Sequence, residues 1–121
     1  MNRSLLPSLI VLAALAAAGA AFGSSSPKPS IHVQPKKVAA GGRVRVYGNA
    51  GACTVGSFVT VISSAFPGDA FGEGTLNARV RANHKYSIRG RLQKRLQPGP
   101  YAVGARCGGG NLGVAAEIRV K

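Results

Sequence analysis

Few side chains in this 121-residue sequence could carry out catalysis. The chain has two histidines, His32 and His84, and three acidic residues, Asp69, Glu73 and Glu117. A serine–histidine–aspartate hydrolase needs a buried histidine as general base, but one histidine falls in an expected edge strand and the other in an expected turn. Glycoside cleavage needs two facing carboxylates, and Glu117 is in a strand distant from the other two. We therefore expect a protein that is not an enzyme.

Two further patterns could suggest a bound metal ion or cofactor. Asp69 and Glu73 are four residues apart in a loop, but calcium takes six or more oxygen ligands, so a solvated loop is our interpretation and we expect no metal site. Gly108, Gly110 and Gly113 match the spacing of a dinucleotide-binding loop. That fingerprint requires a helix after the loop, whereas here a strand is expected. We interpret the segment as a hairpin loop and expect no cofactor.

The two cysteines, Cys53 and Cys107, indicate a disulfide if the chain is exported. Residues 1–23 have a basic start, an apolar stretch and small residues at positions 18–20 and 21–23, which is typical of a cleaved signal peptide. An uncleaved membrane anchor is the alternative. The bridge would close a loop of about 55 residues and stabilise the domain by about 4 kcal/mol. We expect a secreted or cell-envelope-associated protein.

The remaining chain is expected to form one β-sheet domain. Residues 24–30 are rich in serine and proline and are interpreted as a flexible linker, which leaves a domain over 31–121. Apolar residues in the domain alternate with polar ones, as in half-buried strands. The expected strands are 31–35, 43–47, 57–63, 76–81, 85–92, 101–107 and 113–120. Seven short strands with turns between them predict an all-β sandwich.

Two segments resemble known β-sandwich domains. Residues 33–48, VQPKKVAAGGRVRVYG, resemble the opening of bacterial immunoglobulin-like domains. Residues 96–103, LQPGPYAV, are similar to a turn of fibronectin-type sandwiches in which the tyrosine hydroxyl bonds back to the turn backbone. The resemblance covers most of residues 31–120 and implies a seven-stranded immunoglobulin-like sandwich. The chain is also distantly similar to secreted actinobacterial apoproteins of the neocarzinostatin type, which bind a small chromophore in a cleft.

Most of the positive charge belongs to the predicted domain. The sequence has 16 Lys and Arg against 3 Asp and Glu, a net charge of +13. Removing residues 1–23 removes only Arg3, so 15 basic minus 3 acidic residues leaves +12. Strand alternation directs seven of these side chains outward, and in an immunoglobulin-like sandwich their strands share one sheet. These residues are Arg43, Arg45, Arg79, Arg81, Lys85, Arg89 and Arg91.

A basic face of this kind indicates an anionic partner, such as a cell-wall polymer, an acidic glycan, lipid head groups or nucleic acid. The alternative is a solvated face that keeps the sheet soluble and blocks edge-to-edge pairing. The like charges lie on neighbouring strands with almost no acidic partners, which favours a binding function. We expect no aromatic stacking platform on the face, and hence no sequence-specific or single-stranded nucleic-acid recognition. We expect a monomer.

A second hypothesis is a small-molecule carrier of the neocarzinostatin type. Loops 66–74 and 108–113 would form its cleft. The candidate lining residues are Phe58, Phe66, Phe71, Gly109 and Asn111. In the alternative interpretation, the loop aromatics pack onto the core. A structural module that contacts an unknown protein is a third hypothesis.

Overall fold

The computed structural model describes residues 27–68 and 73–121. Within these ranges the chain forms strands and turns and has no helix. The strands are β1 (His32–Gln34), β2 (Lys37–Val38), β3 (Arg43–Asn49), β4 (Phe58–Ser63), β5 (Gly74–Arg79), β6 (Lys85–Arg91), β7 (Gly99–Cys107) and β8 (Gly110–Val120). The predicted signal peptide lies outside the described residues.

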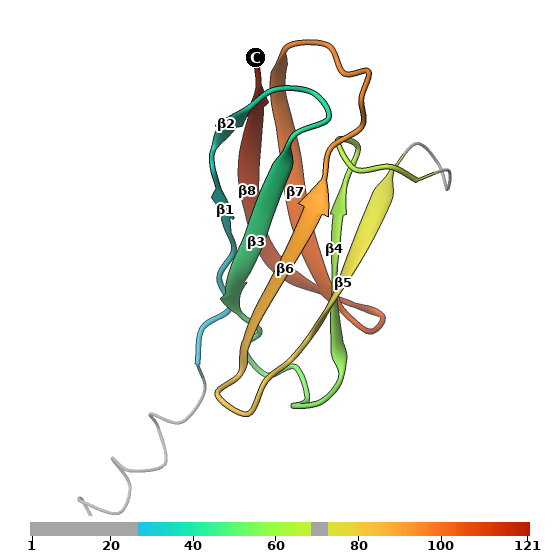
Figure 1. Cartoon of the computed structure of the whole chain (residues 1–121). Coiled ribbons are helices and arrows are strands. Elements are labelled where there is room, and N and C mark those ends of the chain that lie inside the picture. Colours follow the sequence, from blue (N-terminus) through green and yellow to red (C-terminus); the bar gives the residue numbers. More distant parts are fainter. Residues whose placement is uncertain (1–26, 69–72) are drawn as a thin grey trace, which may run out of the picture.

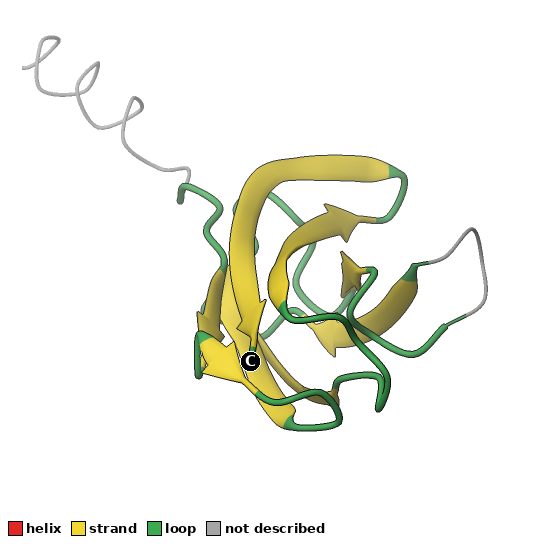
Figure 2. Ribbon diagram, turned by 90° about the horizontal axis from the view of Figure 1, so that it is seen from above, coloured by secondary structure: helices red, strands yellow, loops and turns green. Residues whose placement is uncertain are grey.

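The strands form two sheets that pack face to face (Figure 1). One sheet has the order β1-β3-β6, and the other has the order β2-β8-β7-β4-β5. Neighbouring strands are antiparallel except for β2 and β8, which are parallel. Viewed from above, the long β8 curves over its length (Figure 2). The predicted all-β sandwich is thus confirmed as two sheets, of three and five strands.

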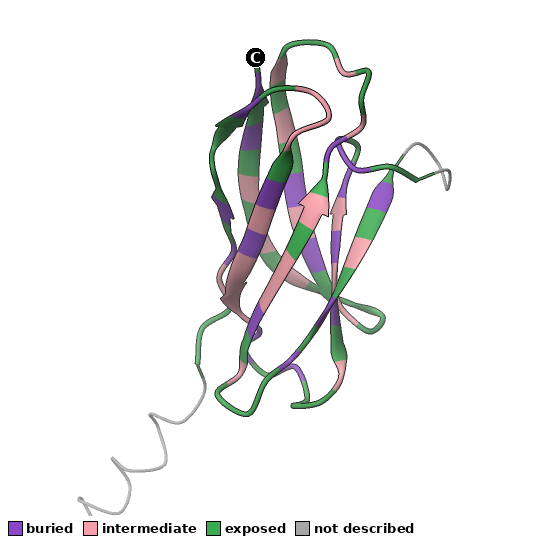
Figure 3. Ribbon diagram, viewed as in Figure 1, coloured by how far each residue is buried: buried purple, intermediate pink, exposed green. Residues whose placement is uncertain are grey.

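The alternation of residue types places the core between the sheets (Figure 3). Val44 and Val46 on β3 are buried, while the arginines beside them are exposed or half-buried. On β4, Val59 and Val61 point inward in the same manner. Apolar side chains that face the other layer leave water together, which holds the sheets to one another. The outward side chains are then left to solvent.

Two expectations about the strands were wrong. Segment 76–81 was expected beside β6, but β5 pairs with β4 at the edge of the five-stranded sheet. Strands adjacent in sequence pair readily, and alternation specifies which face is buried, not which neighbour is chosen. Secondly, no strand was expected at Lys37–Val38, whereas β2 pairs with β8, and Val38 is buried. The described residues therefore contain eight strands rather than seven.

Two predicted local features are confirmed. Cys53 and Cys107 form the disulfide, with a Cα–Cα distance of 5.8 Å, and the bridge joins the segment before β4 to the end of β7. The Tyr101 hydroxyl donates a hydrogen bond of 2.7 Å to the carbonyl oxygen of Gln97 in the turn before β7. The disulfide joins two neighbouring parts of the five-stranded sheet. The hydrogen bond holds the turn that enters β7.

The last residue of the predicted linker belongs to the folded domain. Ser30 donates its backbone N–H to Asn49, and its carbonyl oxygen accepts a hydrogen bond of 2.8 Å from the Tyr86 hydroxyl. The Ser30 hydroxyl also accepts a bond from the backbone N–H of Asn49. These bonds attach the chain to the end of β3 before β1 begins.

Candidate functional site

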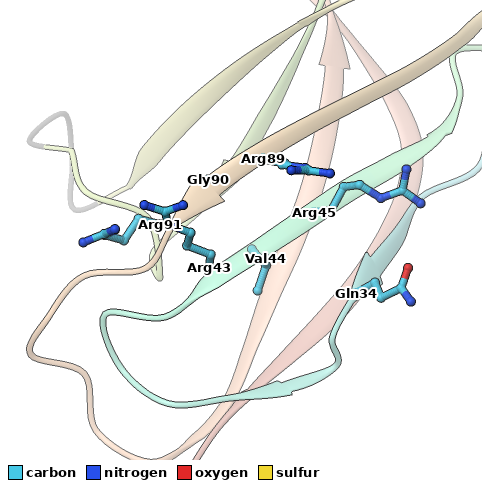
Figure 4. Close-up of a pocket in the computed structure, with 7 residues that line it drawn as sticks. All are labelled: Gln34, Arg43, Val44, Arg45, Arg89, Gly90 and Arg91. Atoms are coloured by element: carbon cyan, nitrogen blue, oxygen red, sulfur yellow. The ribbon is translucent and has the colours of Figure 1, made fainter.

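The outer face of the three-stranded sheet carries a compact group of arginines. Arg43 and Arg45 lie on β3, and Arg91 and Arg89 are their direct partners on β6. Their positions alternate with buried valines on β3 and with the half-buried Ile88 and Gly90 on β6, so the side chains share one face. We call the surface formed by Arg43, Arg45, Arg89 and Arg91 the arginine face. Figure 4 shows these side chains along a shallow groove, with Gln34 of β1 beside Arg45.

The arginine face has no acidic partner within the described residues. The acidic side chains described there, Glu73 and Glu117, are associated with the five-stranded sheet. The ion pair found among the described residues joins Glu117 to Arg119 at 3.5 Å, and both side chains are exposed. Like charges directly opposite on neighbouring strands destabilise a sheet. Two such arginine pairs therefore destabilise the sheet locally, and no carboxylate in residues 27–68 and 73–121 forms an ion pair with them.

Two hollows that share Arg45 lie along this surface. One groove, of about 490 Å³, is lined by the four arginines together with Gln34. A second hollow, of about 560 Å³, shares Arg45 and continues toward the β5–β6 turn. Among its lining residues are the basic side chains Lys28, Arg81 and Lys85. Six of the seven predicted basic residues therefore line these two adjoining hollows, which together we call the strip.

Arg79 is the exception, and its expected position was wrong. It lies on β5 in the five-stranded sheet, directly opposite Phe58. Its guanidinium sits 4.7 Å from the centre of the Phe58 ring and donates a hydrogen bond of 2.9 Å to the carbonyl oxygen of Gly56. The side chain covers an exposed aromatic ring instead of extending the arginine face.

An aromatic residue on this surface was missed. Tyr47 lies on β3 next in the outward series after Arg45, and the Arg45 guanidinium is 4.1 Å from its ring centre. The His32 ring is 5.3 Å away from it on β1. Arg45 also donates a 3.5 Å hydrogen bond to the Ser87 hydroxyl on β6. Strand alternation, applied one step further, would have identified Tyr47.

The residues predicted to line a ligand cleft do not come together. Phe66 is fully buried in the core, whereas Phe58 is 47% exposed on the outside of β4. Phe71 lies outside the described residues, and Gly109 is exposed in the turn between β7 and β8. Phe66 and Phe58 therefore do not line a common cleft, because one ring faces the core and the other faces solvent. The alternative interpretation, in which the loop aromatic packs onto the core, is confirmed for Phe66.

The two predicted cleft loops nevertheless border one groove. Glu73, at the end of the 66–74 loop, and Asn111, in the 108–113 hairpin, both line a groove of about 430 Å³ on the five-stranded sheet. Its floor has small or apolar side chains, including Ala102 and Ala115. The β7–β8 pairing has an irregularity between Gly104 and Arg106, and both residues line this groove. Asn111 is the predicted cleft residue that lines it.

Other kinds of site find no support in residues 27–68 and 73–121. These residues contain no group of three or more histidine, cysteine or acidic side chains close enough to hold a metal ion. They also contain no helix that is both long and apolar enough to span a bilayer. No family model matches the chain, and a search of curated proteins finds no significant relative. Function is therefore inferred from the arrangement of the side chains.

Proposed function

We propose that this protein is a non-enzymatic, exported binding module that presents the arginine face to an anionic polymer at the cell surface or outside the cell. The observation that carries the proposal is the presence of two pairs of directly opposed arginines, Arg43 with Arg91 and Arg45 with Arg89. An anion between two guanidinium groups would remove their mutual repulsion and form charge-assisted hydrogen bonds. Binding would thus offset a cost that the free domain carries.

A purely solvated face is a weaker explanation of the same residues. Solubility calls for a net charge away from zero, with charges of both signs interspersed over the surface. Here the charges are of one sign, directly opposed on adjacent strands, and they continue along the strip to Arg81 and Lys85. Because these like charges are clustered, they concentrate positive potential on one face, and this potential attracts a polyanion over a distance.

The immunoglobulin-like class is part of the proposal. The edge segment divides between the sheets, since β1 pairs with β3 and β2 pairs with β8. The Tyr101 hydroxyl binds the turn before its strand, as in the tyrosine corner of such sandwiches. Export is supported by the Cys53–Cys107 disulfide and by the signal-like composition of residues 1–23. These features fit a small domain that acts outside the cytoplasm.

The test compares two variants that lose equal charge. In the first, Arg43, Arg89 and Arg91 are changed to Gln; in the control, Arg79, Arg106 and Arg119 of the five-stranded sheet are changed to Gln. Retention on immobilised heparin and on insoluble cell-wall fragments is measured against increasing salt. We expect the first variant to elute at much lower salt, since fewer counterions are released, and the control to elute near the wild type. Equal shifts in both variants would mean that net charge alone drives retention.

A second candidate function is a small-molecule carrier that uses the groove between Glu73 and Asn111. The observation in its favour is that both predicted loops border this groove, whose floor consists of Ala102, Gly104 and Ala115. Small side chains leave room for a ligand on an otherwise packed sheet. Native mass spectrometry of protein from its own host would show an added mass if a ligand is retained. The mass of the bare polypeptide would remove this candidate.

A further inference from the structure

β6 is at the edge of the three-stranded sheet, and its register identifies the backbone groups that β3 leaves free (Figure 1). Just after β6, the backbone N–H of Leu92 donates to the carbonyl oxygen of Gly42. Just before β6, the carbonyl oxygen of His84 accepts a bond from the N–H of Ala50. Opposite residues of an antiparallel pair exchange hydrogen bonds at every second position, so the even-numbered residues of β6 bond to β3. The odd-numbered residues direct their N–H and C=O groups to the outer edge.

The outer edge of β6 is tied to the domain at each end. Lys85 donates its backbone N–H to the Asn83 side chain, and its carbonyl oxygen accepts a bond from the N–H of Arg81. Beyond the other end, the N–H of Gln93 donates to the carbonyl oxygen of Ala65. Between these ties, three residues have backbone N–H and C=O groups for which the described part of the chain shows no partner: Ser87, Arg89 and Arg91. The edge is thus open over one short stretch.

This open stretch has basic side chains on its outer face and apolar ones on its inner face. Arg89 and Arg91 are exposed, whereas Ile88, on the inner face, is half-buried against the core. Gly90 has no side chain, and a Cβ atom there would overlap a methyl group of Leu76 on β5. Leu76 is therefore beneath the open stretch and is also half-buried. An added strand would meet positive charge on one face and apolar side chains on the other.

The chemistry of the open stretch determines which partner it can accept. A second copy of β6 would bring further arginines next to Arg89 and Arg91, and like charges opposite one another destabilise a strand pair. A glycan or polyphosphate has no regular series of amide donors and acceptors for the free backbone groups, whereas an extended peptide has one. Acidic residues at alternate positions of a peptide would lie opposite the arginines and stabilise the pairing. Apolar residues between them would cover Ile88 and Leu76.

We propose that the outer edge of β6 binds an extended peptide of another protein, in which acidic residues alternate with apolar ones, as a fourth strand of the sheet. The backbone hydrogen bonds of an added strand supply affinity, and its alternating side chains supply specificity. Such binding goes beyond the proposed function, because it depends on the free backbone groups of the edge as well as on positive charge.

The experiment compares two synthetic peptides of equal charge and composition by isothermal titration calorimetry. In one peptide Glu alternates with Val, and in the other all Glu residues precede all Val residues. The alternating peptide should bind the wild-type domain about tenfold more tightly, since only this peptide can place its charges and its apolar side chains on opposite faces of a strand. Equal affinity would mean that charge alone attracts the peptides and would overturn the strand addition.

Two variants at Ser87 test the backbone contribution. Ser87→Pro removes one edge N–H and keeps every charge, and the pairing with β3 does not use that N–H. Ser87→Ala is the matched control, because it loses only the hydroxyl that accepts a bond from Arg45. We expect the alternating peptide to bind Ser87→Ala like the wild type and Ser87→Pro about tenfold more weakly. Wild-type affinity in Ser87→Pro would overturn the proposal. Retention on heparin should be the same in both variants, which separates this site from the proposed function.

Amide hydrogen exchange of the wild-type domain decides the question if Ser87→Pro does not fold. The alternating peptide should slow exchange at Ser87, Arg89 and Arg91, whereas heparin should not. Unchanged exchange with saturating peptide would overturn the proposal. A dimer of the free domain with these amides already protected would assign the edge to a second copy instead. Peptide binding without heparin retention would overturn the proposed function and leave the strand addition standing.

Discussion

Arg45 on β3 and Arg89 on β6 are directly opposite one another in the antiparallel register, and both lie on the outer face of the three-stranded sheet. Neither forms an ion pair within the described residues, where the observed pair joins Arg119 and Glu117. Arg45 is anchored over the Tyr47 ring, whereas Arg89 is exposed. Two positive side chains are therefore held at opposite positions of neighbouring strands in the folded domain, whereas they can separate in the unfolded chain.

Changing Arg89 to Gln should stabilise the free domain. Removal of one directly opposed like charge is expected to raise the free energy of unfolding by roughly 0.2–1 kcal/mol at low salt. The gain should shrink as salt is added, because salt screens exposed charges. Urea unfolding at low and high salt measures both effects.

Arg106→Gln is the control for this change. Arg106 lies on β7 opposite Thr60 and Asn111, neither of which is charged. Its removal should leave the free energy of unfolding nearly unchanged. If both variants have the same stability at low salt, the opposed pair does not cost the domain anything, and a main support for anion binding is lost.

The layers and the inward residues could be predicted from the sequence, because a strand in which apolar and polar residues alternate has only one apolar face. Val44 and Val46 were assigned inward on that basis and are buried. The partner of each strand is a different matter, since edge pairing depends on backbone hydrogen bonds that every residue type can make. Arg79 was therefore placed on the correct kind of face but in the wrong sheet.

The site was predictable to a similar extent. The register that places Arg43 opposite Arg91 depends on where the β3 and β6 segments align across a long stretch of intervening chain, which local patterns do not encode. Phe66 and Phe58 both looked like loop or strand-end aromatics, but packing buries one and exposes the other. The turn at Tyr101 was predictable because its hydrogen bond is local, with Gln97 four residues earlier.

Loss of the disulfide should strongly destabilise the domain. Cys53 and Cys107 are separated by 54 residues, and closing a loop of this length restricts the unfolded chain by about 4 kcal/mol in the chain-entropy model. A variant with both cysteines changed to Ala should show this loss in urea unfolding. A difference of about 1 kcal/mol or less would mean that the bridge adds little beyond the packing of β4 and β7.

A side chain at Gly48 should displace the segment that enters β1. A Cβ atom there would overlap the carbonyl oxygen of Ser30, which is backbone and has no freedom to rotate away. We expect Gly48→Ala to lower the free energy of unfolding by roughly 1–3 kcal/mol. Gly104→Ala on β7 is the matched control, because a Cβ atom there meets nothing within 4 Å. Equal stability of the two variants would contradict the close approach of Ser30 to β3.

Alkaline pH should destabilise the domain through Tyr86. Its side chain is fully buried, its hydroxyl donates to the Ser30 carbonyl oxygen at 2.8 Å, and burial raises the pKa of Tyr86 from 10.0 to about 12. Between these two pH values the unfolded chain has lost the phenolic proton while the folded domain keeps it. The unfolded state then binds fewer protons, so the free energy of unfolding falls as pH rises.

The contribution is fully present below pH 10 and is lost as pH rises through about 12. A difference of about two pKa units corresponds to about 3 kcal/mol. Urea unfolding across this range should show a steeper decline for the wild type than for Tyr86→Phe, which has no proton to lose. The phenolate absorbance that distinguishes the two proteins should appear with a midpoint near pH 12. Parallel declines, or a midpoint near pH 10, would mean that the Tyr86 hydroxyl is accessible to solvent in the folded domain.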